Sequence, residues 1–460
     1  MQRLFAIAFL TLRAAVRFRL VLMLSGVLLA AVIILPLIIK DDGTARGFTQ
    51  ILLTYTLSVI TAVLGFSTLW LACGTLAREM EEAQMQMIAV KPIPRWQVWV
   101  GKWLGILMLN AILLTASGIA LYVLMQYRAT RLPEAQQTIL RNEVMVARGS
   151  VKEPIPNYEE DVQRFTKARI AAAEGQPLDI NAVTEFARER IKAQMQIVPP
   201  GYLRQWQLDL GIAKPFLKDQ PLFLRTKFNV AQVSEGGTYT GLWEIGPTNN
   251  TAAILRRQMS LASDTFHEIE LPPNVFDENG IVHVRFINQN QTAVLFPLED
   301  GMELLYREGG FGLNFARGLV IILCWLSLLA ALGLAAATFL SFPVAAFVSI
   351  GVLIVGMSSG TFKQIVEEKG ISGVDHETGR IEKQDIVDQI AVPAAAGILK
   401  VLNLIREFSP VEKLSTGRSI SWAETARAIL QIMLMMGGVF AAIGISVFAR
   451  RELANVKTFY

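Results

Sequence analysis

The sequence predicts an α-helical integral membrane protein with about six transmembrane helices and an extracytoplasmic α+β domain that contains a β-sandwich-like part. Of its 460 residues, 52% are hydrophobic and only 18% are charged, whereas soluble domains carry about a quarter charged residues. The apolar residues gather in blocks of about 20, the length of a helix that crosses a bilayer core. A long polar region, 126–312, separates two groups of these blocks.

The N-terminal domain is predicted to span residues 1–125. Residues 1–19 mix apolar side chains with arginines and contain no acid, which is typical of an interfacial helix that binds anionic membrane lipids on the cytoplasmic leaflet. The alternative, that this stretch only extends the first span, stays open. Three transmembrane helices are expected to follow, at 20–39, 50–73 and 103–125.

The extracytoplasmic domain is predicted to occupy 126–312. Its first part, 134–213, is rich in Ala, Glu, Gln and Arg and indicates helices. Its second part, 220–308, contains short segments of alternating apolar and polar residues, separated by turn dipeptides such as Asn279-Gly280. This spacing predicts antiparallel strands of a sandwich. The absence of cysteine from 126–312 favours a bacterial envelope over an animal extracellular space.

The C-terminal domain is predicted to span 313–460. It contains three further apolar blocks, at 315–339, 343–360 and 426–448. The stretch between the last two blocks, 361–425, is mostly polar, so we expect an external segment there.

Lysine and arginine gather beside one set of helix ends. The cations on this side are Arg3, Arg13, Arg17, Arg19, Arg78, Lys91, Arg95, Lys102, Arg450, Arg451 and Lys457. The short loop at 40–46 on the other side offers two cations against two acids. By the positive-inside rule both termini are cytoplasmic, which requires an even number of spans, and 126–312 and 361–425 lie outside.

The loop at 75–102 is the most informative segment. A helix is expected over 77–90, with one apolar stripe formed by Met80, Ala83, Met87 and Val90. Pro92 and Pro94 then end the helix and force a turn. A short rigid helix between two membrane spans can transmit force from a partner protein to both of them.

This loop resembles that of ABC-2-type ABC transporter permeases. The likeness rests on REMEE at 78–82, KPIPR at 91–95 and GK at 101–102, and on FSPV at 408–411 ahead of the last span. It covers residues 1–125 and 313–460. The large extracytoplasmic region looks like an insertion between the third and fourth spans of such a permease.

The resemblance implies the transmembrane subunit of an exporter that moves an unidentified substrate. Such a subunit pairs with a second permease, as a homodimer or heterodimer, and with separate cytoplasmic ABC ATPase subunits. The residues expected to couple to the ATPase are Arg78, Glu79, Glu81, Glu82 and Arg95. The competing interpretation of these charges is an ordinary solvated surface.

Other chemistry has little support in the sequence. No G-x-x-x-x-G-K-[ST] phosphate loop occurs, so ATP would be bound by the partner subunit and this chain is not expected to be an enzyme. We expect no cofactor, no metal and no nucleic-acid partner. The alternative function is a membrane-anchored envelope scaffold or mechanotransmitting sensor without transport, in which the external domain binds an envelope partner.

Overall fold

The computed structural model describes residues 2–17, 20–38, 44–82, 93–140, 144–172, 180–232, 237–247, 254–367, 386–406 and 408–451. The chain divides into two compact units. The helical unit comprises Met1–Val146 and Gly310–Tyr460, and the β unit comprises Ala147–Gly309.

The described part of the helical unit is built almost entirely from helices. In chain order they are α1 (Gln2–Arg17), α2 (Leu20–Ile38), α3 (Ala45–Glu81), α5 (Arg95–Ala129), α6 (Glu134–Ile139), α9 (Phe311–Ala337), α10 (Phe342–Met357), α11 (Ser359–Glu367), α12 (Ile386–Arg406), α13 (Pro410–Ser415), α14 (Trp422–Ala428), η4 (Ile429–Met436) and α15 (Gly437–Arg450). The last three form one continuous helix, in which η4 has π-helical geometry.

Four helical stretches among the described residues are long and apolar enough to cross a membrane. They are Thr49–Glu81, Arg95–Ala129, Phe311–Ala337 and Trp422–Arg450. These four stretches indicate a membrane protein with a separate β-containing region. The expected count of six spans is not clearly reproduced, because the other two predicted spans fall on shorter helices. At 1.5 Å per residue, the 16 residues of α10 cover about 24 Å, less than a bilayer core of about 30 Å.

The helices extend beyond the apolar blocks that predicted them. Helix α3 continues to Glu81 and α5 begins at Arg95, so most of the described part of the 75–102 loop belongs to these two helices. The rest of the helix expected over 77–90 lies outside the described residues. The external segment expected at 361–425 also contains α12, whose stretch Ile390–Asn403 is apolar.

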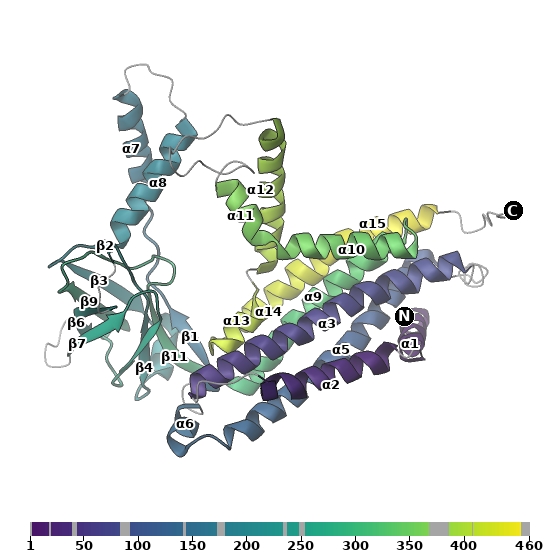
Figure 1. Ribbon diagram of the computed structural model, residues 1–460, viewed down its shortest axis with the longest axis horizontal. Helices are drawn as coiled ribbons and strands as arrows, with labels where there is room; N and C mark the ends of the chain where they lie inside the picture. Colours follow the sequence, from purple (N-terminus) through teal and green to yellow (C-terminus); the bar gives the residue numbers. More distant parts are fainter. Residues whose placement is uncertain are drawn as a thin grey trace. The chain divides into compact units, whose positions relative to one another are not determined.

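Helix α9 lies at the centre of the helical unit. It packs against α3, α5, α10 and α15, and Figure 1 shows it running beside α3. Its buried face is rich in small residues, including Ala330, Ala331 and Gly333. A Cβ atom at position 333 would lie 2.8 Å from the Cβ of Ala72 on α3. Small residues at such a contact let two helices approach closely, as is common in membranes.

Helix α1 packs against the first half of α5. Its buried residues Ala8, Thr11 and Ala15 recur at the spacing of one helix face. Helix α1 lies against Gly101 and Gly105, which are four residues apart on α5: Gly101 lies against Ile7, and Gly105 against Ala8 and Thr11. A Cβ atom at position 105 would lie 2.6 Å from the carbonyl oxygen of Ala8 and 2.8 Å from the Cβ of Thr11. The absence of side chains at these two glycines therefore lets α1 pack closely against α5.

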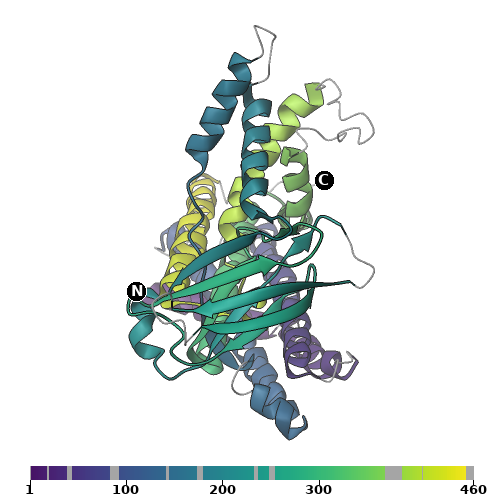
Figure 2. The ribbon, with the colours of Figure 1, turned by 90° about the vertical axis from the view of Figure 1, so that its left-hand side faces the viewer.

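The β unit contains a pair of helices and three β-sheets, which are built largely from antiparallel strand pairs. Its strands are β1 (Val146–Val151), β2 (Ile197–Val198), β3 (Leu203–Asp209), β4 (Leu222–Thr226), β5 (Asn229–Val230), β6 (Thr238–Gly246), β7 (Leu255–Ala262), β8 (His267–Leu271), β9 (Ile281–Asn288), β10 (Val294–Leu295) and β11 (Met302–Gly310). The sheet orders are β1-β11-β4-β8, β2-β10-β5 and β3-β9-β6-β7. Figure 2 shows the strands of this unit facing the viewer.

One apolar core joins the sheets of the β unit. Strand β9 alternates between buried and half-buried residues along its whole length, as a strand with one face on a core must. Four aromatic side chains form the centre of this core. Ring centroids are 5.0 Å apart for Trp206 and Phe296, 4.8 Å for Trp243 and Phe286, and 5.0 Å for Phe286 and Phe296.

The helices of the β unit, α7 (Glu159–Ala171) and α8 (Ile180–Gln196), pack together as a hairpin. Near the C-terminal end of α8, Lys192 forms an ion pair with Glu299 in the turn between β10 and β11. The Lys192 Nζ lies 2.9 Å from a carboxylate oxygen of Glu299. The structure also places β1, β2 and β3 within 134–213, where only helices were expected. In β3 the buried Trp206 and Leu208 alternate with exposed residues, so a period of two prevails.

A tight turn leads into β9 and is organised by Asp277. Its carboxylate accepts hydrogen bonds from the backbone N–H groups of Asn279 at 2.9 Å and Ile281 at 2.8 Å, and Gly280 has a φ of +85°. Burial acts to raise the pKa of Asp277, but the N–H groups of Ile281 and Asn279, together with His283, bring it below its ordinary value.

Substituting Asp277→Ala is expected to lower the stability of the β unit in a pH-dependent way. A depressed pKa in the folded state means that the carboxylate stabilises the fold above its ordinary pKa, and that this contribution is lost as the pH falls through the folded value. At neutral pH we expect a loss of about 2 kcal/mol. Thermal unfolding of the full chain in detergent should show a gap between wild type and variant that closes in acid. Glu278→Ala, at the exposed neighbour, is the control, and a gap independent of pH contradicts the prediction.

Candidate functional site

One end of the helical unit brings together the last turns of α3, α9 and α15 and the first turns of α5 and α10. Polar contacts join these helix ends. We call the residues that make them the helix-end cluster: Arg78, Glu79, Glu81, Arg95, Lys102, Phe342 and Arg451.

A buried ion pair ties α3 to α5 in this cluster. The Lys102 Nζ lies 2.6 Å from a carboxylate oxygen of Glu79, and the two side chains are 4% and 29% exposed. Lys102 also donates a hydrogen bond to the carbonyl oxygen of Thr75 at 3.1 Å. A lysine buried this deeply within a helix bundle needs its acidic partner, because an uncompensated charge there is strongly destabilising.

The end of α3 also holds the start of α10. The guanidinium carbon of Arg78 lies 4.2 Å from the centre of the Phe342 ring. The Glu81 carboxylate accepts a hydrogen bond from the backbone N–H of Phe342 at 2.9 Å. The N-cap residue of α10, Ser341, makes no side-chain capping bond, so Glu81 satisfies an N–H that the helix leaves open and places a negative charge at its positive end.

Two arginines cap the C-terminal ends of helices α15 and α9. Arg95, the first residue of α5, donates to the carbonyl oxygens of Phe448 at 2.8 Å, Ala449 at 2.8 Å and Arg451 at 2.7 Å. Arg451 in turn donates to the carbonyl oxygen of Thr338, just beyond α9, at 2.7 Å. Both cations lie at the negative ends of helix dipoles and satisfy carbonyl groups that have no partner within the helix.

These contacts link five helices at one end of the bundle. The segment between α3 and α5, residues 83–92, is flanked by Glu82 and Ile93 and lies outside the described residues. A displacement of the ends of this segment would act on α10 through Glu81, on α15 through Arg95 and then on α9 through Arg451. The helix-end cluster is thus suited to passing a mechanical movement from this loop to helices remote in the sequence.

Substituting Arg95→Ala is expected to fray the last turn of α15 and to destabilise the chain by about 2 kcal/mol, because three carbonyl groups lose a charged donor. Arg95→Lys should recover part of this loss, since it keeps a positive charge and N–H donors near the end of α15. Hydrogen exchange at residues 445–451 and thermal unfolding in detergent measure the two effects. Arg450→Ala removes an exposed cation from the same turn, and an equal effect from that control contradicts a capping role.

Further polar contacts lie deeper between the helices. Thr68 on α3 donates to the side-chain oxygen of Asn110 on α5 at 3.0 Å, and both residues are buried. The indole N–H of Trp103 donates to the carbonyl oxygen of Ser327 on α9 at 3.0 Å. Such bonds join neighbouring helices in an apolar surrounding.

The structure places the sequence-predicted coupling residues close together but gives most of them internal partners. Arg78, Glu79 and Glu81 lie in the last turn of α3 and Glu82 is its C-cap, whereas Arg95 starts α5. Sequence reasoning missed three members of the cluster, Lys102, Phe342 and Arg451. Lys102 carried a usable signal, because a lysine three residues after Trp99 and one before Trp103 stands inside an otherwise apolar helix.

No family model, curated protein or solved structure matches this chain. Within the described ranges, no three His, Cys, Asp or Glu side chains gather closely enough to hold a metal ion.

Proposed function

We propose that this chain is the permease subunit of an ABC-2-type exporter in a bacterial cytoplasmic membrane. It moves a substrate outward with a second permease and is driven by separate ATPase subunits, which bind the ATP. The observation that carries the proposal is the helix-end cluster, which connects both ends of the 83–92 segment to α9, α10 and α15. The resemblance of this loop to ABC-2-type permeases supports the same function.

The charge distribution supports the proposed orientation. Arg78, Arg95 and Lys102 lie at the same end of the bundle as Arg451, and positive side chains favour the cytoplasmic side. In the proposed topology α2 and α10 also cross the membrane, which gives six spans and two cytoplasmic termini. The β unit then faces outward, where it binds an envelope partner or the second permease.

The contact surface for the ATPase is proposed to lie beside the helix-end cluster, on the exposed residues at the end of α3. Glu81 and Glu82 are exposed, whereas Glu79 is half-buried against Lys102. A change at Glu79 would disturb the bundle itself. Glu82→Lys is therefore the better probe of partner binding, because it reverses a charge at the surface.

Affinity purification of the tagged full chain in mild detergent, followed by mass spectrometry, tests the proposal. We expect a cytoplasmic ATPase to co-purify with the native chain and to be lost with Glu82→Lys. Glu412→Lys reverses an exposed charge on α13, at the other end of α9, and should retain it. Recovery of envelope proteins alone, without an ATPase, would replace transport by the scaffold or sensor function.

A further inference from the structure

Helix α1 has two faces of different character. Ala8, Thr11 and Ala15 are buried, and Ala8 and Thr11 lie against Gly105 of α5. On the remaining surface, large apolar side chains are exposed: Phe5 by 57%, Phe9 by 48% and Leu10 by 63%. A helix that exposes this many apolar groups while its other face is already packed needs an apolar environment outside the protein.

Cations accompany these apolar groups, and no acid does. Arg13 and Arg17 are exposed and lie one turn apart, and the first 40 residues contain neither Asp nor Glu. Within the described part of the chain, neither arginine forms an ion pair with a carboxylate. The guanidinium of Arg13 lies 4.4 Å from the centre of the Phe9 ring, which holds it against the apolar surface by a cation–π interaction.

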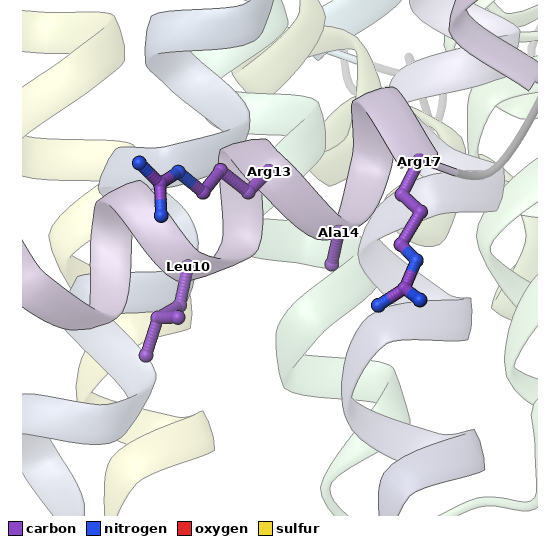
Figure 3. A pocket seen from close by; sticks show the side chains of 4 residues that line it. All are labelled: Leu10, Arg13, Ala14 and Arg17. Carbon is purple, nitrogen blue, oxygen red and sulfur yellow. The ribbon is translucent and has the colours of Figure 1, made fainter.

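A pocket of about 690 Å³ opens beside these residues, and Leu10, Arg13, Ala14 and Arg17 line it. Figure 3 shows the small side chain of Ala14 between the two arginines. Side chains four residues apart on a helix have Cβ atoms about 6 Å apart. Figure 3 shows the two guanidinium groups pointing in different directions. Because both side chains are exposed, they can turn about their flexible bonds, and both can then donate paired N–H groups to one phosphate.

We propose that this pocket binds the phosphate of an anionic phospholipid. Arg13 and Arg17 hold the headgroup, and Leu10 and Phe9 contact its acyl chains. The combination of two cations with exposed apolar side chains identifies a lipid rather than a soluble phosphate, because a soluble phosphate would leave the apolar groups in water. The net charge of a zwitterionic headgroup is zero, so an anionic lipid is favoured.

Through this site, the lipid composition of one leaflet would affect the packing of the helix bundle. Helix α1 packs on Gly101 and Gly105 of α5, next to Lys102 of the helix-end cluster. A lipid held by α1 therefore acts on the helix that begins at Arg95. This inference stands independently of the transport proposal, because it concerns only α1 and its surface.

Native mass spectrometry of the full chain in detergent tests the site. The chain is titrated with phosphatidylglycerol or with phosphatidylcholine of identical acyl chains. We expect the native chain to retain phosphatidylglycerol about tenfold more strongly, and the double variant Arg13→Gln/Arg17→Gln to lose this preference. Arg131→Gln is a matched control, because Arg131 also stacks on an aromatic ring four residues before it, at 4.8 Å, but lies just beyond the C-terminal end of α5.

Each possible outcome decides the proposal. Equal retention of the two lipids, or an unchanged preference in the double variant, overturns the site. A loss of preference in Arg131→Gln as large as that in the double variant shows a general charge effect and also overturns it. Inorganic phosphate at the same concentration should not displace the lipid, and full displacement would reassign the pocket to a soluble anion. Thermal unfolding of each variant confirms that it is folded.

Discussion

Substituting Glu79→Ala is expected to destabilise the helical unit by about 3–5 kcal/mol. The substitution removes the partner of Lys102, whose side chain is 4% exposed. Among the described residues, the positive charge would then have only the Thr75 carbonyl oxygen, 3.1 Å away, to compensate for the loss of hydration.

The double variant Glu79→Ala/Lys102→Met should be more stable than Glu79→Ala alone, because an unbranched apolar side chain of similar length removes the buried charge. Reversible unfolding of the full chain in mixed micelles, with both single variants, completes a double-mutant cycle. Glu412→Ala, at an exposed acid, controls for the loss of a carboxylate as such. If the double variant is no more stable than Glu79→Ala, the pair does not stabilise the bundle in the way its geometry implies.

Substituting Gly105→Leu is expected to displace α1 from α5. Even a Cβ atom at this position would lie 2.6 Å from the Ala8 carbonyl oxygen, and a backbone atom cannot turn aside as a flexible side chain can. Overpacking of this kind costs about 1–3 kcal/mol and often more. We expect trypsin to cleave after Arg13 and Arg17 about tenfold faster in the variant, because a helix without its packing partner opens locally.

A matched glycine is available for comparison. Gly26 lies within α2, and a Cβ atom there would have no neighbour within 4 Å. Gly26→Leu should therefore leave cleavage of α1 unchanged and add helix propensity, since glycine is about 1 kcal/mol worse than alanine in a helix. Equal cleavage rates for Gly105→Leu and Gly26→Leu would show that Gly105 does not hold α1 against α5.

The sequence predicted features that depend on local periodicity and composition. In the four long apolar helices and in strands such as β9, the pattern of apolar residues is visible in the segment itself. It can be recognised without knowing what the segment packs against. The same holds for α1, whose arginines and apolar side chains lie together in the chain. Helix α12 was missed because its apolar stretch is shorter than a membrane span and contains Pro393, which normally ends a helix. Strand β3 was missed because a short alternating run follows a helical region.

The contacts of the helix-end cluster could not be predicted in this way. Glu79 and Lys102 are 23 residues apart, and Arg95 meets carbonyl groups 353 to 356 residues away. Every residue has a backbone carbonyl, so a bond to one cannot be read from the residue types. The sequence around Arg95 therefore does not distinguish a helix cap from a surface cation. The role of Gly101 was missed for a related reason, since its meaning depends on the close approach of α1.

The chain enters the β unit along β1 and leaves it along β11, and these two strands are hydrogen-bonded neighbours. Gly149 of β1 lies against the ring of Tyr306 of β11, and β11 runs directly into α9 at Phe311. Adjacent strands are only about 4.8 Å apart. Because the chain enters and leaves the β unit through adjacent strands, an engineered hairpin can replace the whole unit while the two chain ends on the helical side stay close together.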